Sequence, residues 1–202
     1  IMDSQRIVQA LIQRLFIELE ASGRHVHLTR EAAFTLFGHG LTEKRPLSQP
    51  GQFVCDERVT IVGPKFEIKN VAVLGPCRNK TQVEISMTDS FKLGIKAPIR
   101  ESGHLDGSAA CKLVGPKGEV SLNEGVIIAK RHIHMPLTDS EKSGITNGTI
   151  VKVAIKNGER SLVFDDVVVR VSEKFALAMH IDTDEANACG FEKGIEGEII
   201  MY

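Results

Sequence analysis

Two copies of a histidine-x-histidine string are the residues of this chain best suited to chemistry. The first copy is Arg24-His25-Val26-His27-Leu28 and the second is Arg131-His132-Ile133-His134-Met135. In a β-strand alternate side chains lie on the same face, which places the two imidazoles of each copy less than about 7 Å apart. Two imidazole nitrogens can then bind one metal ion at about 2.0–2.1 Å each. The spacing predicts two strands that each carry a metal-binding histidine pair.

The histidine pairs belong to an internal repeat. Asn70-Val71-Ala72-Val73 matches Asp166-Val167-Val168-Val169, and counting forward from this match without a gap places Glu84 opposite His180. Two surface strands that carry histidine by coincidence would not explain this shared later position. The repeat predicts two metal sites with three protein ligands each: His25, His27 and Glu84 in the first half, and His132, His134 and His180 in the second.

Three protein ligands per site leave coordination positions open. Structural zinc sites usually have four protein ligands, whereas catalytic zinc sites keep a position for water or substrate. Histidine and carboxylate ligands suit zinc, although cobalt, nickel, manganese or iron could occupy the same set. We therefore expect two zinc ions per chain, with other divalent metals as alternatives.

Two further stretches could bind an oxyanion. Arg78 lies shortly before Glu84, and Arg100-Glu101-Ser102-Gly103 offers an arginine, a hydroxyl and a glycine in one turn. The planar guanidinium of arginine matches two phosphate oxygens at once, and donors in a turn complement an anion. Together with two metal sites, these residues suggest phosphate or another oxyanion as a substrate.

The elements that must position these residues are mostly short strands. Val151-Lys152-Val153-Ala154-Ile155 alternates and is followed by Asn157-Gly158, a two-residue hairpin signal. Gly63-Pro64 and Gly115-Pro116 mark turns. A similar series of strands is expected in the first half, at residues 59–62, 65–69, 71–74 and 81–85. Many short strands separated by turns are typical of closed sheets, and the repeat makes two related units. We predict a mainly β fold of two related small β-barrels with short capping helices.

Short helices are expected after each histidine pair. One covers residues 30–37 and ends at Gly38, and the other opens with the capping box Thr138-Asp139-Ser140-Glu141 and ends at Gly144. The predicted first barrel comprises residues 16–122 and the second comprises residues 123–202. The first half is longer, and we expect its extra residues in a loop near 39–51.

The N-terminal segment, residues 1–15, is predicted to be a separate amphipathic helix. Apolar residues recur on one side at helical spacing: Ile7, Val8, Leu11, Ile12 and Leu15. Such a helix could pack on the barrel or on a second subunit, or it could detach and dock into a partner. Because no proposed ligand precedes His25, we expect the segment to be dispensable for chemistry.

Composition excludes several classes of protein. The chain has a formal net charge of −1 and 5% aromatic residues with no Trp, which provides neither a basic field nor a stacking surface for nucleic acid. No apolar run approaches the roughly 20 residues that span a membrane, and no signal peptide is expected. The four cysteines lack any regular spacing and are interpreted as thiols of a reducing compartment. We expect a soluble intracellular protein.

These motifs resemble those of the PduL-type phosphate propanoyltransferases, a phosphotransacylase family. The resemblance covers nearly all of the chain from about Phe16. The strings that carry it are Ser22-Gly23-Arg24-His25-Val26-His27-Leu28, Arg100-Glu101-Ser102-Gly103, Lys130-Arg131-His132-Ile133-His134-Met135 and Met179-His180-Ile181-Asp182-Thr183-Asp184-Glu185-Ala186-Asn187. It implies a two-barrel zinc enzyme that interconverts propanoyl-CoA or acetyl-CoA plus phosphate with acyl phosphate plus CoA.

The resemblance also implies roles for single residues. One zinc site would have a position open to the CoA sulfur, and the other would be completed by water. These sites are formed by His25, His27 and Glu84, and by His132, His134 and His180, respectively. Arg78 matches an arginine that handles phosphate, Ser102 matches a serine near it, and residues that bind CoA are not assigned. We expect phosphate to attack the thioester directly with zinc assistance, in preference to a covalent route through Cys77.

The resemblance further implies a cellular setting. Such enzymes commonly serve bacterial microcompartments that degrade propanediol or similar substrates, with shell proteins as partners and the N-terminal segment as an encapsulation extension. We therefore expect the protein in the bacterial cytoplasm, inside a microcompartment. Assembly into a homo-oligomer is compatible with these expectations. Two other classes fit the same residues: a dinuclear-metal phosphoester hydrolase and a non-catalytic, metal-stapled microcompartment module. The phosphate dependence of acyl-CoA loss would separate these classes.

Overall fold

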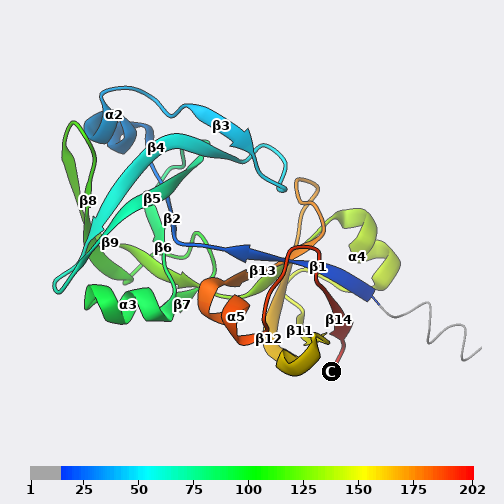
Figure 1. Cartoon of the computed structure of the whole chain (residues 1–202). Helices are drawn as coiled ribbons and strands as arrows, with labels where there is room; N and C mark the ends of the chain where they lie inside the picture. Colours follow the sequence, from blue (N-terminus) through cyan, green and yellow to red (C-terminus); the bar gives the residue numbers. More distant parts are fainter. Residues whose placement is uncertain (1–14) are drawn as a thin grey trace, which may run out of the picture. The chain divides into compact units, whose positions relative to one another are not determined.

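The computed structural model describes residues 15–202, and these residues are mainly β (Figure 1). The chain divides into two compact units. The first barrel unit comprises Ser22–Lys130 and Asp182–Asp184. The second barrel unit comprises the described residues up to Ala21, Arg131–Ile181 and Glu185–Tyr202.

The first barrel unit is built around a closed ring of six strands in the order β4-β5-β2-β6-β9-β8. Two short strands lie outside the ring, where β3 pairs with β4 and β7 pairs with β9. The elements are β2 (His25–His27), α2 (Arg30–Phe37), β3 (Glu43–Pro46), β4 (Phe53–Val62), β5 (Glu67–Gly75), β6 (Gln82–Glu84), α3 (Met87–Leu93), β7 (Ile99–Arg100), β8 (Ala109–Val114) and β9 (Glu119–Ala129).

The second barrel unit contains a closed ring of the same size, in the order β1-β13-β10-β12-β11-β14. Its elements are β1 (Leu15–Ser22), β10 (His132–Met135), α4 (Leu137–Ser143), β11 (Ile150–Ile155), the 3₁₀ turn η1 (Gly158–Arg160), β12 (Leu162–Val171), β13 (Ala178–Asp182), α5 (Thr183–Ala188) and β14 (Glu196–Ile200). The prediction of a mainly β fold with two related barrels and short helices is confirmed.

The two halves of the repeat exchange one strand. In the first ring β6 lies beside β9, the strand that directly precedes β10. In the second ring β13 lies beside β1, the strand that directly precedes β2. Each half of the sequence therefore supplies its first strand to the other barrel. For this reason the units differ from the predicted ranges 16–122 and 123–202.

The repeat is visible in the backbone as well. Asn70 and Asp166, which open the matched strings, have φ of 58° and 53°, and they are the non-glycine residues with positive φ in the described chain. Asparagine and aspartate tolerate this left-handed conformation better than other residues with a Cβ atom. Each lies inside a long strand, β5 or β12, where the pairing with the neighbouring strand shifts register.

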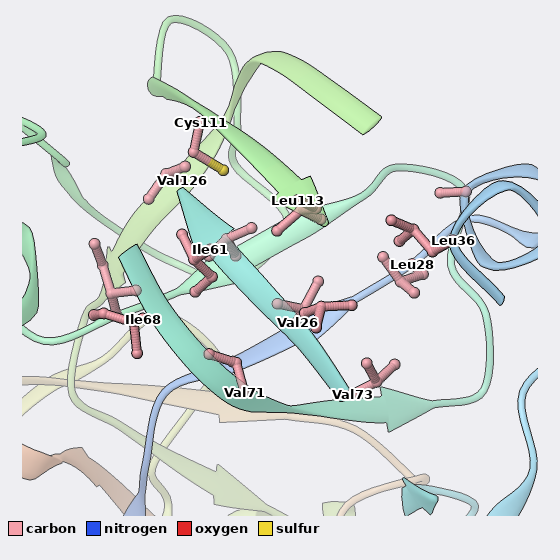
Figure 2. Packing of buried hydrophobic residues seen from close by; sticks show 14 of the residues in the cluster. Val26, Leu28, Leu36, Ile61, Ile68, Val71, Val73, Cys111, Leu113 and Val126 are labelled. Carbon is pink, nitrogen blue, oxygen red and sulfur yellow. The ribbon is translucent and has the colours of Figure 1, made fainter. Parts of the chain in front are cut away.

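The barrel core decides where the histidines point. Val26 is fully buried, and Figure 2 shows it among other aliphatic side chains of the first barrel, with Ile61, Val73 and Leu113 close by. Because neighbours alternate along a strand, the side chains on either side of Val26 lie on the face of β2 away from this core. Ile133 is likewise buried in the core of the second barrel, so its neighbours His132 and His134 lie on the opposite face of β10.

Two local predictions are wrong. Helix α4 begins at Leu137 with Pro136 at its N-cap, so no side-chain capping bond forms and Thr138 is not the cap. The connection between β11 and β12 is longer than a two-residue hairpin, because it includes the η1 turn. Asn157 in this loop donates from its side chain to the backbone oxygens of Cys189 and Gly190.

The predicted N-terminal helix lies outside the described residues, except for Leu15, which begins strand β1. Strand β3 lies in the stretch where the extra residues of the first half are expected. Within residues 15–202 no helix is long and apolar enough to cross a membrane.

The turn that begins at Gly115 fixes helix α2 to the first barrel. The Lys117 backbone N–H donates to the Leu36 oxygen at 3.0 Å, and a Cβ atom on Gly115 would lie 2.5 Å from that same oxygen. A side chain at this position therefore forces the helix end or the turn to move. Glycine is required here by close approach of two backbones.

Replacing Gly115 by alanine is expected to lower the free energy of unfolding by about 1–3 kcal/mol, the usual cost of overpacking a tight contact. Urea denaturation followed by circular dichroism measures this loss. Gly40→Ala is the matched control, because a Cβ atom on Gly40 would have no other atom within 4 Å. We expect the control to change stability by less than about 0.5 kcal/mol. Equal stabilities of the two variants would contradict the role of this contact.

Candidate metal centres and oxyanion site

The first cluster contains His25, His27 and Glu84. Strand β2 pairs with β6 in antiparallel fashion, which places His25 directly opposite Glu84. The ligand atoms of the three side chains lie within 4.8 Å of one another, and all three residues are buried. The register of β2 and β6 therefore brings together the three residues that the repeat predicts as ligands of the first metal site.

The imidazoles of this cluster are oriented by the backbone. His25 Nδ1 lies 2.9 Å from the Gly23 oxygen, so this nitrogen donates and Nε2 faces Glu84 at 3.4 Å from Oε2. His27 forms a backbone hydrogen bond with Leu74, while its buried Nδ1 has no hydrogen-bond partner among residues 15–202. A buried ring nitrogen in this state suits a metal ion, because an unmet acceptor in a low dielectric is costly.

The electrostatics of the cluster favour the metal-binding forms of Glu84 and His27. Burial alone would raise the pKa of Glu84, but the nearby His25 and His27 outweigh it and hold the pKa of this carboxyl well below its usual range. Burial, with His25 and Arg78 adding to it, holds the pKa of His27 well below its ordinary value. For His25, burial opposes protonation, yet Glu84 leaves its pKa raised. A cation is coordinated by an ionised carboxylate and by neutral imidazoles, so Glu84 and His27 are held in the binding state, whereas a metal ion would have to displace the proton that Glu84 favours on His25.

A hydrogen-bonded network joins this cluster to Arg78. Ser102 Oγ donates to Glu84 Oε1 at 3.1 Å and accepts from Arg78 Nη1 at 3.1 Å. The serine therefore bridges the candidate metal ligand and the candidate phosphate-binding arginine. Arg100, the other arginine considered for the oxyanion, is exposed at the end of β7, where its backbone oxygen accepts from the Lys130 N–H at 2.9 Å.

Gln82 completes the network, and sequence reasoning missed it. Its Nε2 donates to Glu84 Oε1 and, at 2.8 Å, to Ser102 Oγ, while its Oε1 accepts from the Gly103 N–H at 2.8 Å. The side chain is 1% exposed. The available signal was its place two positions before Glu84, on the same face of a strand.

Replacing Gln82 by methionine is expected to reduce kcat/KM about 10- to 100-fold, as is usual for residues that orient metal ligands. Methionine keeps the volume but provides neither donor nor amide oxygen for Glu84, Ser102 and Gly103. Steady-state kinetics with varied phosphate, together with metal content, measure the effect. Gln49→Met, at a second buried glutamine, is the control and should keep its activity. Wild-type kinetics for the Gln82 variant would contradict a positioning role.

The second cluster contains His132, His134 and His180. His132 lies opposite His180 in the antiparallel pairing of β10 with β13. The three ligand atoms are within 4.8 Å of one another, as in the first cluster. The ring of Phe175 stacks on His134 with centroids 3.9 Å apart, which restricts the rotation of that imidazole.

An arginine before each histidine pair forms an equivalent ion pair. Arg24 Nε lies 2.7 Å from the carboxylate of Asp89, and Arg131 Nη1 lies 2.7 Å from that of Glu185. Each acidic partner lies in the helix that follows the third ligand, α3 or α5. The two ion pairs thereby fix each histidine strand to the segment that carries its third ligand.

Cys77, the thiol considered for a covalent route, is partly buried. It packs against the hydrophobic core of the first barrel, and its neighbour Cys55 is buried enough that the pKa of the Cys55 thiol rises to about 12. The side chains of Ser102, Gln82 and His25 contact the Glu84 carboxylate.

Three known proteins that are similar to this chain carry the same name. A phosphate propanoyltransferase of Listeria monocytogenes is 61% identical over 186 residues, which cover 91% of this chain and 87% of that protein. One of Clostridioides difficile is 56% identical over 200 residues (96% and 95%), and one of Thermotoga maritima is 52% identical over 192 residues (94% and 91%). The sequence model for phosphate propanoyltransferase matches residues 18–192. The chain therefore belongs to the phosphate propanoyltransferase family.

Proposed function

We propose that this protein is a phosphate acyltransferase that interconverts a short-chain acyl-CoA plus phosphate with acyl phosphate plus CoA. Propanoyl-CoA and acetyl-CoA are the proposed acyl donors. Membership of the family supports the reaction class. The observation that carries the proposal is the Ser102 hydroxyl, which links the Arg78 guanidinium to the buried Glu84 carboxylate.

We also propose that each three-ligand cluster holds one zinc ion. The support is the donor sets themselves: three imidazoles in the second cluster, and two imidazoles with one carboxylate in the first, each gathered within 4.8 Å. In the first cluster the pKa values of Glu84 and His27 are both lowered, which favours the forms that bind a cation. Zinc bound there would supply positive charge that favours a thiolate leaving group and a developing oxyanion.

The side chains around Glu84 have separate tasks in this proposal. Arg78 binds the phosphate, since a planar guanidinium can present two parallel N–H donors to two phosphate oxygens and lies beside Ser102. Ser102 and Gln82 hold that arginine and the Glu84 carboxylate in one fixed arrangement. Holding phosphate against the acyl group removes much of the entropic cost of bringing two substrates together.

The proposed reaction is a direct displacement. An oxygen of hydrogen phosphate attacks the thioester carbonyl carbon, the new C–O bond forms, and the C–S bond breaks. The sulfur leaves with the bonding electron pair and receives the proton that hydrogen phosphate carried, which yields acyl phosphate and CoA thiol. No acyl-enzyme is required, and Cys77 has no part in the reaction.

The setting of the enzyme is part of the same proposal. The relatives named above are bacterial proteins, which supports the bacterial cytoplasm as its location. A microcompartment, shell proteins as partners and an encapsulation role for residues 1–15 rest on the family resemblance of the sequence.

CoA release from acetyl-, propanoyl- and butanoyl-CoA, measured with and without phosphate, tests the proposed function. We expect release to require phosphate and to differ among the three substrates by up to about 10- to 200-fold, since one methylene in a fitted pocket contributes about 1–3 kcal/mol. Release without phosphate would identify a hydrolase instead. No release under either condition would identify a non-catalytic module.

A further inference from the structure

The two candidate metal sites differ in charge. The first set includes one carboxylate, Glu84, whereas the third member of the second set is His180. Two histidines and a carboxylate around a divalent cation leave a net charge of +1, and three neutral histidines leave +2. The second barrel nevertheless places a carboxylate nearby, because Glu20 Oε2 lies 3.6 Å from His180 Nδ1.

The repeat explains where this carboxylate comes from. In the first barrel Glu84 of β6 is in register with Ile127 of β9. In the second barrel the corresponding neighbours are β13, which carries His180, and β1, which carries Glu20. The spacing from His132 back to Ile127 equals the spacing from His25 back to Glu20. Glu20 and Ile127 are therefore equivalent positions on the exchanged strands.

Each barrel thus has one carboxylate beside its histidine pair, but on different strands. In the first barrel the ligand is acidic and its neighbour on the exchanged strand is apolar. In the second barrel the ligand is an imidazole and its neighbour is acidic. The Glu20 side chain is 30% exposed and that of His180 is 12% exposed, so water screens their interaction only in part.

A carboxylate in this position has a defined chemical effect. When it accepts the Nδ1–H of an imidazole, it selects one tautomer and directs Nε2 away from itself. It also orients the ring and increases the basicity of the ligating nitrogen. In β1, Ile17 and Leu19 point into the core, so Glu20 is held on the outer face of the barrel by the alternation of the strand.

We propose that Glu20 is the outer carboxylate of the second metal site, where it accepts the Nδ1–H of His180 and leaves Nε2 for the metal. This inference rests on the proposed zinc site at His132, His134 and His180. It makes strand β1 part of the metal site as well as part of the barrel wall.

Metal titration of the stripped full-length protein tests the proposal. Zinc is added in competition with a chromophoric chelator to the wild type, Glu20→Gln, Glu18→Gln and His180→Ala. We expect two ions in the wild type, one ion in His180→Ala, and a 10- to 100-fold weaker affinity for one of the two ions in Glu20→Gln. Glu18→Gln is the matched control, because Glu18 is exposed on the same face of β1, and it should bind as the wild type does.

Wild-type affinity for both ions in Glu20→Gln overturns the role of Glu20 while leaving the second site intact. Equal metal content in the wild type and His180→Ala overturns the second site itself and the role of Glu20 with it. A second measurement needs no variant: nitrogen NMR of the zinc-loaded wild type, with labelled histidine, reads the tautomer of His180. A proton on Nδ1 supports the proposal, and a proton on Nε2 contradicts it.

Discussion

Replacing Arg78 by lysine is expected to lower kcat/KM for phosphate about 10- to 150-fold, although the charge is kept. Lysine cannot donate to Ser102 and to two phosphate oxygens from one rigid plane. Hydrogen bonds to charged groups contribute about 1.5–3 kcal/mol each, and about 1.4 kcal/mol corresponds to tenfold. The backbone N–H of Arg78 donates to the Leu28 oxygen at 2.8 Å, so the substitution changes the side chain of a position that stays fixed.

Initial rates with varied phosphate at saturating acyl-CoA measure this loss. Arg58→Lys is the matched control, because Arg58 is a half-buried arginine of the same barrel whose guanidinium bonds to the backbone oxygens of Cys55 and Glu57. We expect this control to retain its KM for phosphate. Wild-type kcat and KM for the Arg78 variant would show that Arg78 does not bind the phosphate.

Replacing Glu84 by glutamine is expected to lower kcat about 100- to 1,000-fold and to abolish zinc binding at the first candidate metal site. The amide keeps the size of the side chain but loses the negative charge that makes the first cluster a cation site. A bound metal contributes several kcal/mol to the stabilisation of developing charge, which corresponds to this range. Elemental analysis of the purified variant and initial rates with propanoyl-CoA measure the two effects.

His180→Ala distinguishes the two candidate sites, because it should abolish zinc binding at the second site and leave the first site filled. A double variant, Glu84→Gln with His180→Ala, should then hold no zinc. If the Glu84 variant keeps both ions and normal turnover, its carboxylate is not a ligand. If it loses both ions, the two clusters are not independent sites.

The two candidate metal sites illustrate what sequence can predict. The third ligand of each set follows from carrying one match forward along the repeat, and the structure places His25 opposite Glu84 and His132 opposite His180 by strand register. This inference is within reach because a β-strand has a strict period of two, so a residue type and a count determine a face. The barrels themselves follow from short strands, frequent turns and the same repeat.

Contacts between segments distant in the sequence are beyond that reasoning. The exchange of β1 and β9 between the barrels leaves no local mark, because either barrel could accept a strand of that pattern. The role of Gln82 depends on its hydrogen bonds to Ser102 and Gly103, which are distant from it in the sequence. The predicted start of α4 is wrong because the helix begins at Leu137, and Pro136 at its N-cap has no side-chain oxygen that could accept a backbone N–H.

Phosphorus NMR of the reaction with propanoyl-CoA and inorganic phosphate tests the central claim most directly. A thiol reagent measures released CoA in the same samples. We expect a propanoyl phosphate signal to grow as the phosphate signal declines, with one acyl phosphate formed for each thiol released. Adding propanoyl phosphate and CoA should run the reaction in reverse. Thiol release with an unchanged phosphate signal would contradict the account, because water rather than phosphate would then be the acceptor of the acyl group.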